Sequence, residues 1–533
     1  MTIFRDRSLV SDWHCSTRTI ASAAAAVVLS VSSVLHAQAA PAPVDAAPPA
    51  EVAPAPAPAP APVEVTPAPA PEPAPAPPVV LVAPPPPVVV IAPPAPAAPP
   101  PSPPVGLVPT GSFFGRYEVR ANYDEIGVSR PARFLEGDAF FYRARLGLAT
   151  TPIPISESAN VMLQFTPQTA GVMGTLPNTI TDATIGLHEG YLRAATSSVR
   201  FDIGRFEMNY GDSLVIGSLD WNETGRSFDG MRARVAPSGP TGYYVDFFGT
   251  MVREGRELTP FAGGDQYFMG VYAGLGPAIT TGLDLDLYML PQIYTKANAI
   301  DLAPLDPMNA PTEREPAAEV TFGVRAKQKV DMIDYRAEAG LQVGKRPRGF
   351  PLTAMGMAVP PPAELDNADV MAYQIDAEVG VTPVDMLRLG LEGMLASGDD
   401  PTTADKNEGW NELYPTAHKF LGLADIFHQG GQKRTNVGSA VLHVTLKPTT
   451  ELTLQLDGHI FTRMQPMAPM AKDGGFAGAE VDTGIGYALG KGLNLKALYA
   501  VFVPNEDFYP QGNVAADEKL AHYLELELRY DLK

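Results

Sequence analysis

The chain has 533 residues, of which 45% are hydrophobic, yet beyond its N-terminus it holds no uninterrupted apolar run of about 18 residues, the length that a membrane-spanning helix needs. The formal net charge of -20 argues against a nucleic-acid partner, because binding to phosphates needs a basic surface. The single cysteine, Cys15, excludes an internal disulfide framework and fits a protein that matures outside the cytoplasm without one.

Residues 1–39 have the pattern of a secretory signal peptide. A basic region precedes an apolar stretch, Ile20–Leu35, which is followed by the small-x-small sequence Ala37-Gln38-Ala39. The basic residues are Arg5, Arg7 and Arg18. This pattern predicts cleavage after Ala39, and a retained membrane anchor is the alternative.

Residues 40–110 are dominated by Pro-Ala repeats. Proline removes an amide donor and fixes φ, so this linker is expected to be extended polyproline II or disordered. At about 3.1 Å per residue, such a segment reaches on the order of 200 Å when fully extended. Two interpretations are open: a plain spacer, or a tether that crosses the periplasm or contacts the cell wall.

Residues 111–533 alternate between apolar and polar side chains with a period of two. In one example, Tyr142, Ala144 and Leu146 alternate with Arg143 and Arg145. About eighteen such segments follow one another, each of roughly 9 to 13 residues, the length that a tilted strand needs to cross a bilayer core. Short connections such as Pro237–Thr241 alternate with long ones such as Gly398–Arg434. The pattern predicts an all-β fold, a transmembrane antiparallel β-barrel.

A soluble all-β protein is the alternative fold, since its strands also alternate. Charged residues on nearly every polar face oppose it, because a soluble core has no place for a charged layer while apolar residues point outward. A closed barrel in lipid reverses this arrangement and satisfies every backbone amide. A barrel of about eighteen strands is too wide for side chains to fill, so we expect a water-filled lumen.

The positions expected to face the lumen are rich in arginine along the early strands. These basic residues are Arg116, Arg120, Arg143, Arg145, Arg193, Arg200, Arg232, Arg234 and Arg325. Arginine stays charged and binds carboxylates bidentately, so the row favours an acidic polysaccharide or small organic anions. The alternative is that the arginines pair with carboxylates across the wall and only keep the lumen hydrated and rigid. The acidic residues expected to line the pore are Glu118, Asp246, Asp284, Asp286, Glu338, Asp376 and Glu378.

The net charge of the barrel region argues against a uniformly basic pore. Residues 1–109 contain three basic and six acidic residues, so the remaining 36 basic and 53 acidic residues give this region a charge of -17. A polyanion exporter should instead show a positive inner field. We therefore expect a divided lumen, with arginines on the early strands and carboxylates on the later ones.

The segment Gly211–Arg226 lies between two expected strands and is predicted to be an external loop. If it folds inward, Asp220, Trp221 and Arg226 are the candidate residues of a constriction, and the indole offers a face for stacking on a sugar. The alternative is that Trp221 anchors at the lipid interface, where barrels carry aromatic girdles.

Two long segments resemble those of a known family. GRFEMNYGDSLVIGSLDWNETGRSFDGMRARV (204–235) and ASGDDPTTADKNEGWNELYPTAHKFLGLADIF (396–427) resemble, in the same order, segments of the alginate-export type of outer-membrane porin. The resemblance extends from roughly Gly111 to the C-terminus. It implies an outer-membrane barrel of about eighteen strands and, as substrate, an anionic polysaccharide such as alginate.

No catalytic residue, metal ligand or cofactor site is predicted. The eight histidines are scattered, and no Ser-His-Asp, paired-carboxylate or metal-ligand spacing stands out. No P-loop indicates energy-driven pumping. A hydrolase with residues gathered from several loops is the minor alternative.

The sequence therefore predicts a passive, multi-pass channel in the outer membrane of a Gram-negative-type bacterium, in contact with its lipids and lipopolysaccharide. Its expected cargo is an anionic polysaccharide or small hydrophilic solutes. Two alternatives are a general diffusion porin without polymer preference and a structural barrel that anchors the proline-rich tether.

Overall fold

The computed structural model describes residues 105–123, 137–173, 184–239, 242–254, 264–298, 313–347, 364–365, 367–400, 402–403, 405–426, 434–465, 475–505 and 520–532. The predicted signal peptide and most of the predicted proline-rich linker lie outside these residues. In the described part of the chain, no helix is both long and apolar enough to cross a membrane.

Antiparallel β-strands make up nearly all of the described structure. The first half of the wall consists of β1 (Leu107–Ala121), β2 (Gly137–Thr150), β4 (Asn160–Met173), β5 (Thr184–Ala195), β6 (Val199–Phe206), β7 (Phe228–Val235), β8 (Tyr244–Arg253), β9 (Gln266–Gly274) and β10 (Leu283–Tyr294). The second half consists of β13 (Ala317–Val330), β14 (Ile333–Pro347), β16 (Asn367–Val384), β17 (Leu387–Ala396), β19 (Val437–Leu446), β20 (Leu452–Thr462), β21 (Phe476–Gly490), β22 (Leu493–Pro504) and β23 (Ala521–Leu532).

The remaining elements are short. They are β3 (Ile153–Pro154), β11 (Ala297–Asn298), β12 (Glu313–Arg314), β15 (Glu364–Leu365), β18 (Lys406–Asn407), the helical turn α2 (Gly276–Ile279) and the 3-10 turn η4 (Ala417–Lys419). The main sheet has 20 strands, but β3 and β18 are only two residues long, so 18 strands build the wall.

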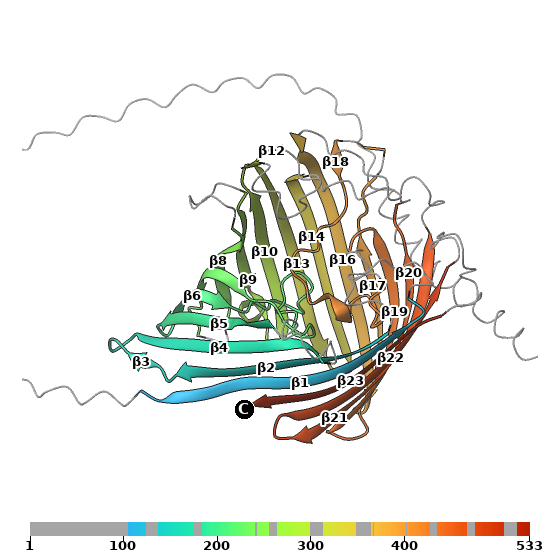
Figure 1. Cartoon of the computed structure of the whole chain (residues 1–533), viewed down its shortest axis with the longest axis horizontal. Helices are drawn as coiled ribbons and strands as arrows, with labels where there is room; N and C mark the ends of the chain where they lie inside the picture. The colour runs from blue at the N-terminus through green and yellow to red at the C-terminus, as the bar shows by residue number, and fades with distance from the viewer. Residues whose placement is uncertain are drawn as a thin grey trace, which may run out of the picture. The chain divides into compact units, whose positions relative to one another are not determined.

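The wall is closed, because its first strand pairs with its last. β1 pairs on one edge with β2 and on the other with β23, in a register that sets Gly111 opposite Leu532 (Figure 1). Closure pairs the first and last strands, so the backbone amides along the length that they share find partners without water, as a lipid environment requires. The predicted antiparallel barrel of about eighteen strands is confirmed.

β1 begins at Leu107, four residues before the expected start of the pattern at Gly111, and so contains Pro109. Its pairing with β23 starts only at Gly111, whereas its pairing with β2 starts at Leu107. In the described structure, residues 107–110 of β1 therefore pair with β2 on one side and have no strand partner on the other. Such an edge is where a sheet accepts proline.

Short and long connections lie at opposite rims of the barrel. Asp331 and Met332 alone join β13 to β14, and Lys491 and Gly492 alone join β21 to β22. Lys491 and Gly492 both have positive φ, 52° and 86°, as a two-residue hairpin turn requires. Residues 207–227 and 397–436 are long connections at the other rim. We call these ends the short-turn rim and the long-loop rim; β1 starts and β23 ends at the short-turn rim.

The two faces of the wall follow the period-two pattern. Outward side chains are large and apolar, and exposed fractions of 73% for Leu146 and 85% for Ile185 mark a surface made for lipid. Inward side chains are charged and buried, including Arg143 between Tyr142 and Ala144 on β2. The two apolar cores of the molecule lie inside the barrel, where described residues of the long connections 207–227 and 397–436 pack against the wall strands.

Candidate functional site

Every arginine predicted to line the pore lies on the inner face and is paired with a carboxylate. The pairs are Arg116 and Arg120 with Glu118; Arg143 and Arg145 with Asp220; Arg193, Arg200 and Arg232 with Asp202; Arg234 with Asp246; and Arg325 with Asp212 and Asp286. Some of these contacts are pairings between wall strands, the alternative that the sequence left open, whereas those of Asp212 and Asp220 join the wall to a loop. The contacts leave some clusters with more arginines than carboxylates.

The clearest surplus of positive charge surrounds Asp202 on β6. Its carboxylate lies 2.6 Å from Arg193, 3.3 Å from Arg200 and 2.8 Å from Arg232. Asp202 is fully buried, while the side chains of Arg193 and Arg200 keep 24% and 27% of their surface exposed. Arg200 is the second residue of β6, so this Asp202 cluster lies inside the barrel near its short-turn rim.

A cluster of the opposite sign surrounds Arg336 on β14. Its guanidinium lies 3.1 Å from Asp376, 3.4 Å from Glu378 and 2.7 Å from Glu392. Arg388 on β17 also contacts Glu378, at 2.7 Å. This Arg336 cluster holds more carboxylates than cations, as expected for the later strands.

The predicted acidic residues are also on the inner face, most of them buried. The buried ones are Glu118, Asp246, Asp286, Glu338 and Asp376, and Glu378 is partly exposed. Glu338 accepts a hydrogen bond of 2.9 Å from the hydroxyl of Tyr288. Asp284 is exposed and lines a cavity of about 440 Å³ together with Asp212, Tyr244 and Lys327.

The connection between β6 and β7, residues 207–227, runs across the lumen, and we call it the crossing loop. At one side Asp212 contacts Arg325 and Lys327 of β13, each at 2.9 Å. At the other side Asp220 contacts strands β2 and β23. In the wall order β13 lies nine strands from β1, which separates β2 from β23, so the two contacts are on opposite sides of the barrel.

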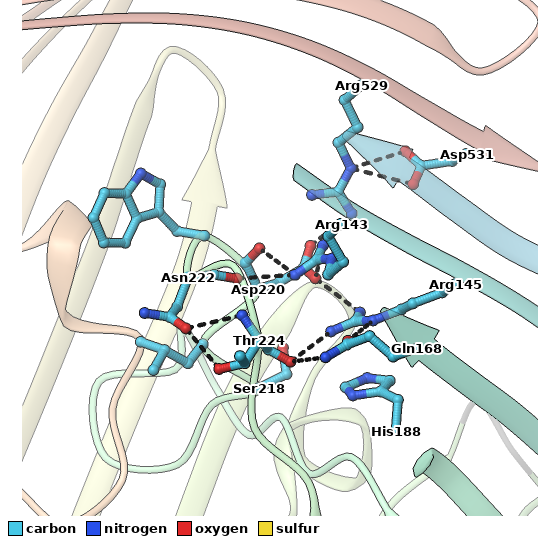
Figure 2. A network of polar contacts seen from close by, with 12 residues as sticks. Arg143, Arg145, Gln168, His188, Ser218, Asp220, Asn222, Thr224, Arg529 and Asp531 are labelled. Carbon is cyan, nitrogen blue, oxygen red and sulfur yellow. Dashed lines mark hydrogen bonds and ion pairs between the residues drawn. The ribbon is translucent and has the colours of Figure 1, made fainter. Parts of the chain in front are cut away.

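Three arginines converge on the carboxylate of Asp220 (Figure 2). Arg143 and Arg145 of β2 donate to one oxygen at 2.8 and 3.1 Å, and Arg529 of β23 contacts the other at 2.6 Å. Burial by itself raises the pKa of Asp220, but the charges of Arg143, Arg529 and Arg145 outweigh it and hold the pKa below its usual range. Asp220 therefore stays ionised at neutral pH.

Trp221 lies inside the barrel rather than at the lipid interface. Its ring stacks on His418 at a centroid distance of 3.9 Å, and its indole N–H donates to Glu525 of β23 at 3.0 Å. The guanidinium of Arg116 lies 4.4 Å from the ring centre. Both ring faces are thus close to protein groups, so the indole is not open for a sugar in this conformation.

Residues 397–436 connect β17 to β19, and we call them the capping loop; the part of this loop around Tyr414 packs against the crossing loop. Gly217 donates to the carbonyl of Tyr414 at 2.8 Å, and Tyr414 donates to that of Val215 at 3.0 Å. Arg226 donates to the carbonyl of Pro415 at 2.9 Å. The two loops therefore form one body inside the barrel, and Arg226 joins them rather than facing open solvent.

The residues predicted to line the pore did not include several charged residues of this site, among them Arg336, Arg529 and Asp212. Arg336 and Arg529 lie on the polar side of clear period-two strands, so the alternation was sufficient to find both. Asp212 lies in the crossing loop, and its contact with Arg325 joins residues 113 positions apart. No local pattern predicts that contact. Among the described residues, no group of three or more side chains is arranged to hold a metal ion.

A closed barrel with an apolar exterior, a charged interior and long loops at one rim defines the outer-membrane channels of Gram-negative bacteria. Within that class, the alginate export family matches residues 187–522, and the chain belongs to this family. The match includes both the crossing loop and the capping loop.

Solved structures share the fold at low sequence identity. OccK5 (OpdH) of Pseudomonas aeruginosa is 11% identical with a TM-score of 0.51, over 80% of this chain and 98% of that one. The outer membrane protein OpdK of the same organism is 12% identical with a TM-score of 0.51, over 80% and 99%. A structure of OpdK with vanillate gives 12% and 0.50, over 80% and 98%. A search of curated proteins finds no match.

Proposed function

We propose that this outer-membrane channel conducts anions passively and that its substrate is an acidic polysaccharide such as alginate. The Asp202 cluster carries the proposal, because three arginines surround one carboxylate and two of them keep about a quarter of their surface exposed to the lumen. Arg234, which pairs with Asp246 on the neighbouring strands, adds a fourth arginine nearby. Exposed guanidinium groups bind carboxylates bidentately, so the cluster favours entry of a chain of uronate sugars.

The position of the Asp202 cluster supports an export role. In outer-membrane barrels the short turns face the periplasm, so the cluster lies at the periplasmic mouth. A polyanion made in the cell meets this mouth first, and a local positive field raises its concentration there. In this proposal Asp220, Trp221 and Arg226 belong to the constriction that the polymer meets next.

The test is the ion selectivity of the purified barrel in planar bilayers, read as the reversal potential under a salt gradient. We expect an anion-selective wild type and loss of this selectivity in the double variant Arg200→Gln/Arg232→Gln. Arg205→Gln is the matched control, because Arg205 lies at the outer surface of the same strand and is also paired with a carboxylate, Asp229. Equal selectivity in the double variant and the control would reject the proposal.

Two other functions each have an observation in their favour. The excess of carboxylates around Arg336 favours a general diffusion porin, and cation selectivity in the wild type would support it. The crossing loop favours a structural barrel whose lumen is closed. Absence of conductance in both the wild type and Asp220→Asn, which lacks the charged contact of Asp220 with β2 and β23, would support that function.

The N-terminal part of the chain completes the proposal. We propose that residues 1–39 are cleaved after export and that residues 40–106, which precede β1, form a tether in the periplasm. β1 starts at the short-turn rim, which is consistent with a periplasmic tether. Co-sedimentation of the protein with purified cell wall, compared with a variant that lacks residues 41–103, tests contact with the wall.

A further inference from the structure

The crossing loop carries two carboxylates that contact basic groups on opposite walls. Asp212 and Asp220 lie eight positions apart, and each contacts at least two cationic side chains. In this respect the loop resembles a short polyanion that lies across the pore. The basic groups that contact Asp212 and Asp220 have the chemistry to bind the carboxylates of a solute as well.

The Asp220 site is built on the rigid part of the molecule. Arg143 and Arg145 lie on β2, Arg529 lies on β23, and β1 joins these strands at the closure of the barrel. Asp220, the carboxylate that all three contact, in contrast belongs to a loop. Because the three arginines are held by wall strands and Asp220 by a loop, another carboxylate can replace that of Asp220 without a change in the strands of the wall.

Charge decides what can replace Asp220. Arg143 is fully buried and Arg145 nearly so, and buried guanidinium groups without a counter-ion are strongly unfavourable. A neutral solute in place of Asp220 would leave Arg143 without a carboxylate in the described structure, whereas Arg145 keeps Glu207 at 3.5 Å and Arg529 keeps Asp531 at 3.2 Å. Another carboxylate would restore the three charge-assisted hydrogen bonds, so acidic solutes exchange with Asp220 at small cost and neutral solutes do not.

The surroundings of Asp220 allow such a release. Arg143 also donates to the carbonyls of Asp220 and Asn222 at 3.2 and 3.0 Å, and Gln168 donates to that of Thr224 at 2.8 Å. Figure 2 shows these contacts to be made between wall side chains and loop backbone, which water or sugar hydroxyls can replace.

We infer that Asp220 is an internal carboxylate that occupies the Arg143–Arg145–Arg529 site, and that a carboxylate of the arriving polyanion displaces it and releases the crossing loop. This inference rests on the proposed anion-conducting function. It makes the polyanion both the substrate and the signal that opens its own path. The arginines of this site are then specificity-determining residues that distinguish acidic from neutral polysaccharides.

The experiment measures single-channel open probability with galacturonate oligomers as the probe and maltose oligomers of equal length as the neutral control. In the wild type we expect the acidic oligomer to raise open probability about tenfold, the ratio given by about 1.4 kcal/mol of differential binding, and the neutral one to leave it unchanged. Asp220→Asn should be open without any oligomer and indifferent to both. Asp220→Glu, which keeps the carboxylate, should keep the response.

Asp229→Asn is the matched control, because it removes a carboxylate that is also paired with an arginine, here Arg205 at 2.5 Å, but that lies on strand β7 at the outer surface. It should respond as the wild type does. A response of Asp220→Asn equal to that of the control, or equal opening by both oligomers, would overturn the inference.

Fluorescence gives a second readout that does not depend on current. The chain has three tryptophans, Trp13, Trp221 and Trp410, and Trp13 lies in the predicted signal peptide. In a Trp410→Phe background, Trp221 is then the one tryptophan of the barrel region and lies next to Asp220. Acidic oligomers should shift its emission and neutral oligomers should not. No shift with the acidic oligomer would also overturn the inference.

The outcomes separate this inference from the proposed function. An anion-selective channel whose opening ignores both Asp220 and the acidic oligomer refutes the inference and leaves the proposed function intact. A channel opened by Asp220→Asn that shows no anion selectivity refutes the proposed function, and with it the inference that depends on it.

Discussion

The Asp202 and Arg336 clusters are two versions of one arrangement with the signs reversed. At β6 one carboxylate is shared by three arginines, and at β14 one arginine is shared by three carboxylates. The two strands are six positions apart in the wall. The central residue of each cluster, Asp202 or Arg336, holds several groups of the opposite charge together. The Asp202 cluster therefore has an excess of positive charge and the Arg336 cluster an excess of negative charge.

The two clusters differ in how much of that excess charge reaches the lumen. Arg193 and Arg200 are 24% and 27% exposed, whereas Asp376 and Glu392 around Arg336 are 0% and 7% exposed. The positive excess is therefore presented to solutes and most of the negative excess is covered. This difference is what the proposed anion conduction requires of a barrel region whose net charge is -17.

The largest expected difference between the two clusters is in the free energy of unfolding when the central residue, Arg336 or Asp202, is replaced. Arg336→Met removes the cation shared by Asp376, Glu378 and Glu392. Glu378 keeps Arg388 and Glu392 keeps His443, but the buried Asp376 loses this partner, and we expect a loss of about 3–5 kcal/mol in the free energy of unfolding. Asp202→Asn should cost only about 1–3 kcal/mol, because its arginines reach water. Urea unfolding of the folded barrel in lipid vesicles measures both. A larger loss for Asp202→Asn would mean that the exposure of its arginines does not relieve their repulsion.

The second largest expected effect is on the charge selectivity of the channel. Asp202→Asn removes a negative charge from the exposed cluster, so the anion-to-cation permeability ratio should rise about fivefold, equivalent to about 1 kcal/mol, in dilute salt. At about 1 M salt the Debye length falls to about 3 Å, and the increase should nearly vanish. Reversal potentials at the two salt concentrations test this. A ratio that stays constant in dilute salt would show that the Asp202 cluster is not part of the permeation path.

The wall and the sides of its strands could be predicted from the sequence, because a strand in a barrel is governed by local alternation. Arg143 and Asp246 were placed on the inner face in this way, and the rule extends to Arg336 and Arg529. The partners of these residues were not predictable, because they depend on strand register and on loops. Trp221 shows the limit, since its hydrogen bond to Glu525 joins residues 304 positions apart.

The smallest predicted effect concerns the contact of the crossing loop with β23. Trp221→Phe keeps an aromatic ring against His418 but removes the hydrogen bond to Glu525, so we expect a loss of about 1 kcal/mol. Trp410→Phe is the matched control: its buried indole nitrogen has no hydrogen-bond partner in the described structure, so only packing changes. The difference between the two variants in urea unfolding isolates the hydrogen bond. If Trp410→Phe lowers the free energy of unfolding as much as Trp221→Phe does, ring packing alone holds the crossing loop at Trp221. The charged contacts of Asp220 then account for the specific attachment of the loop to β2 and β23.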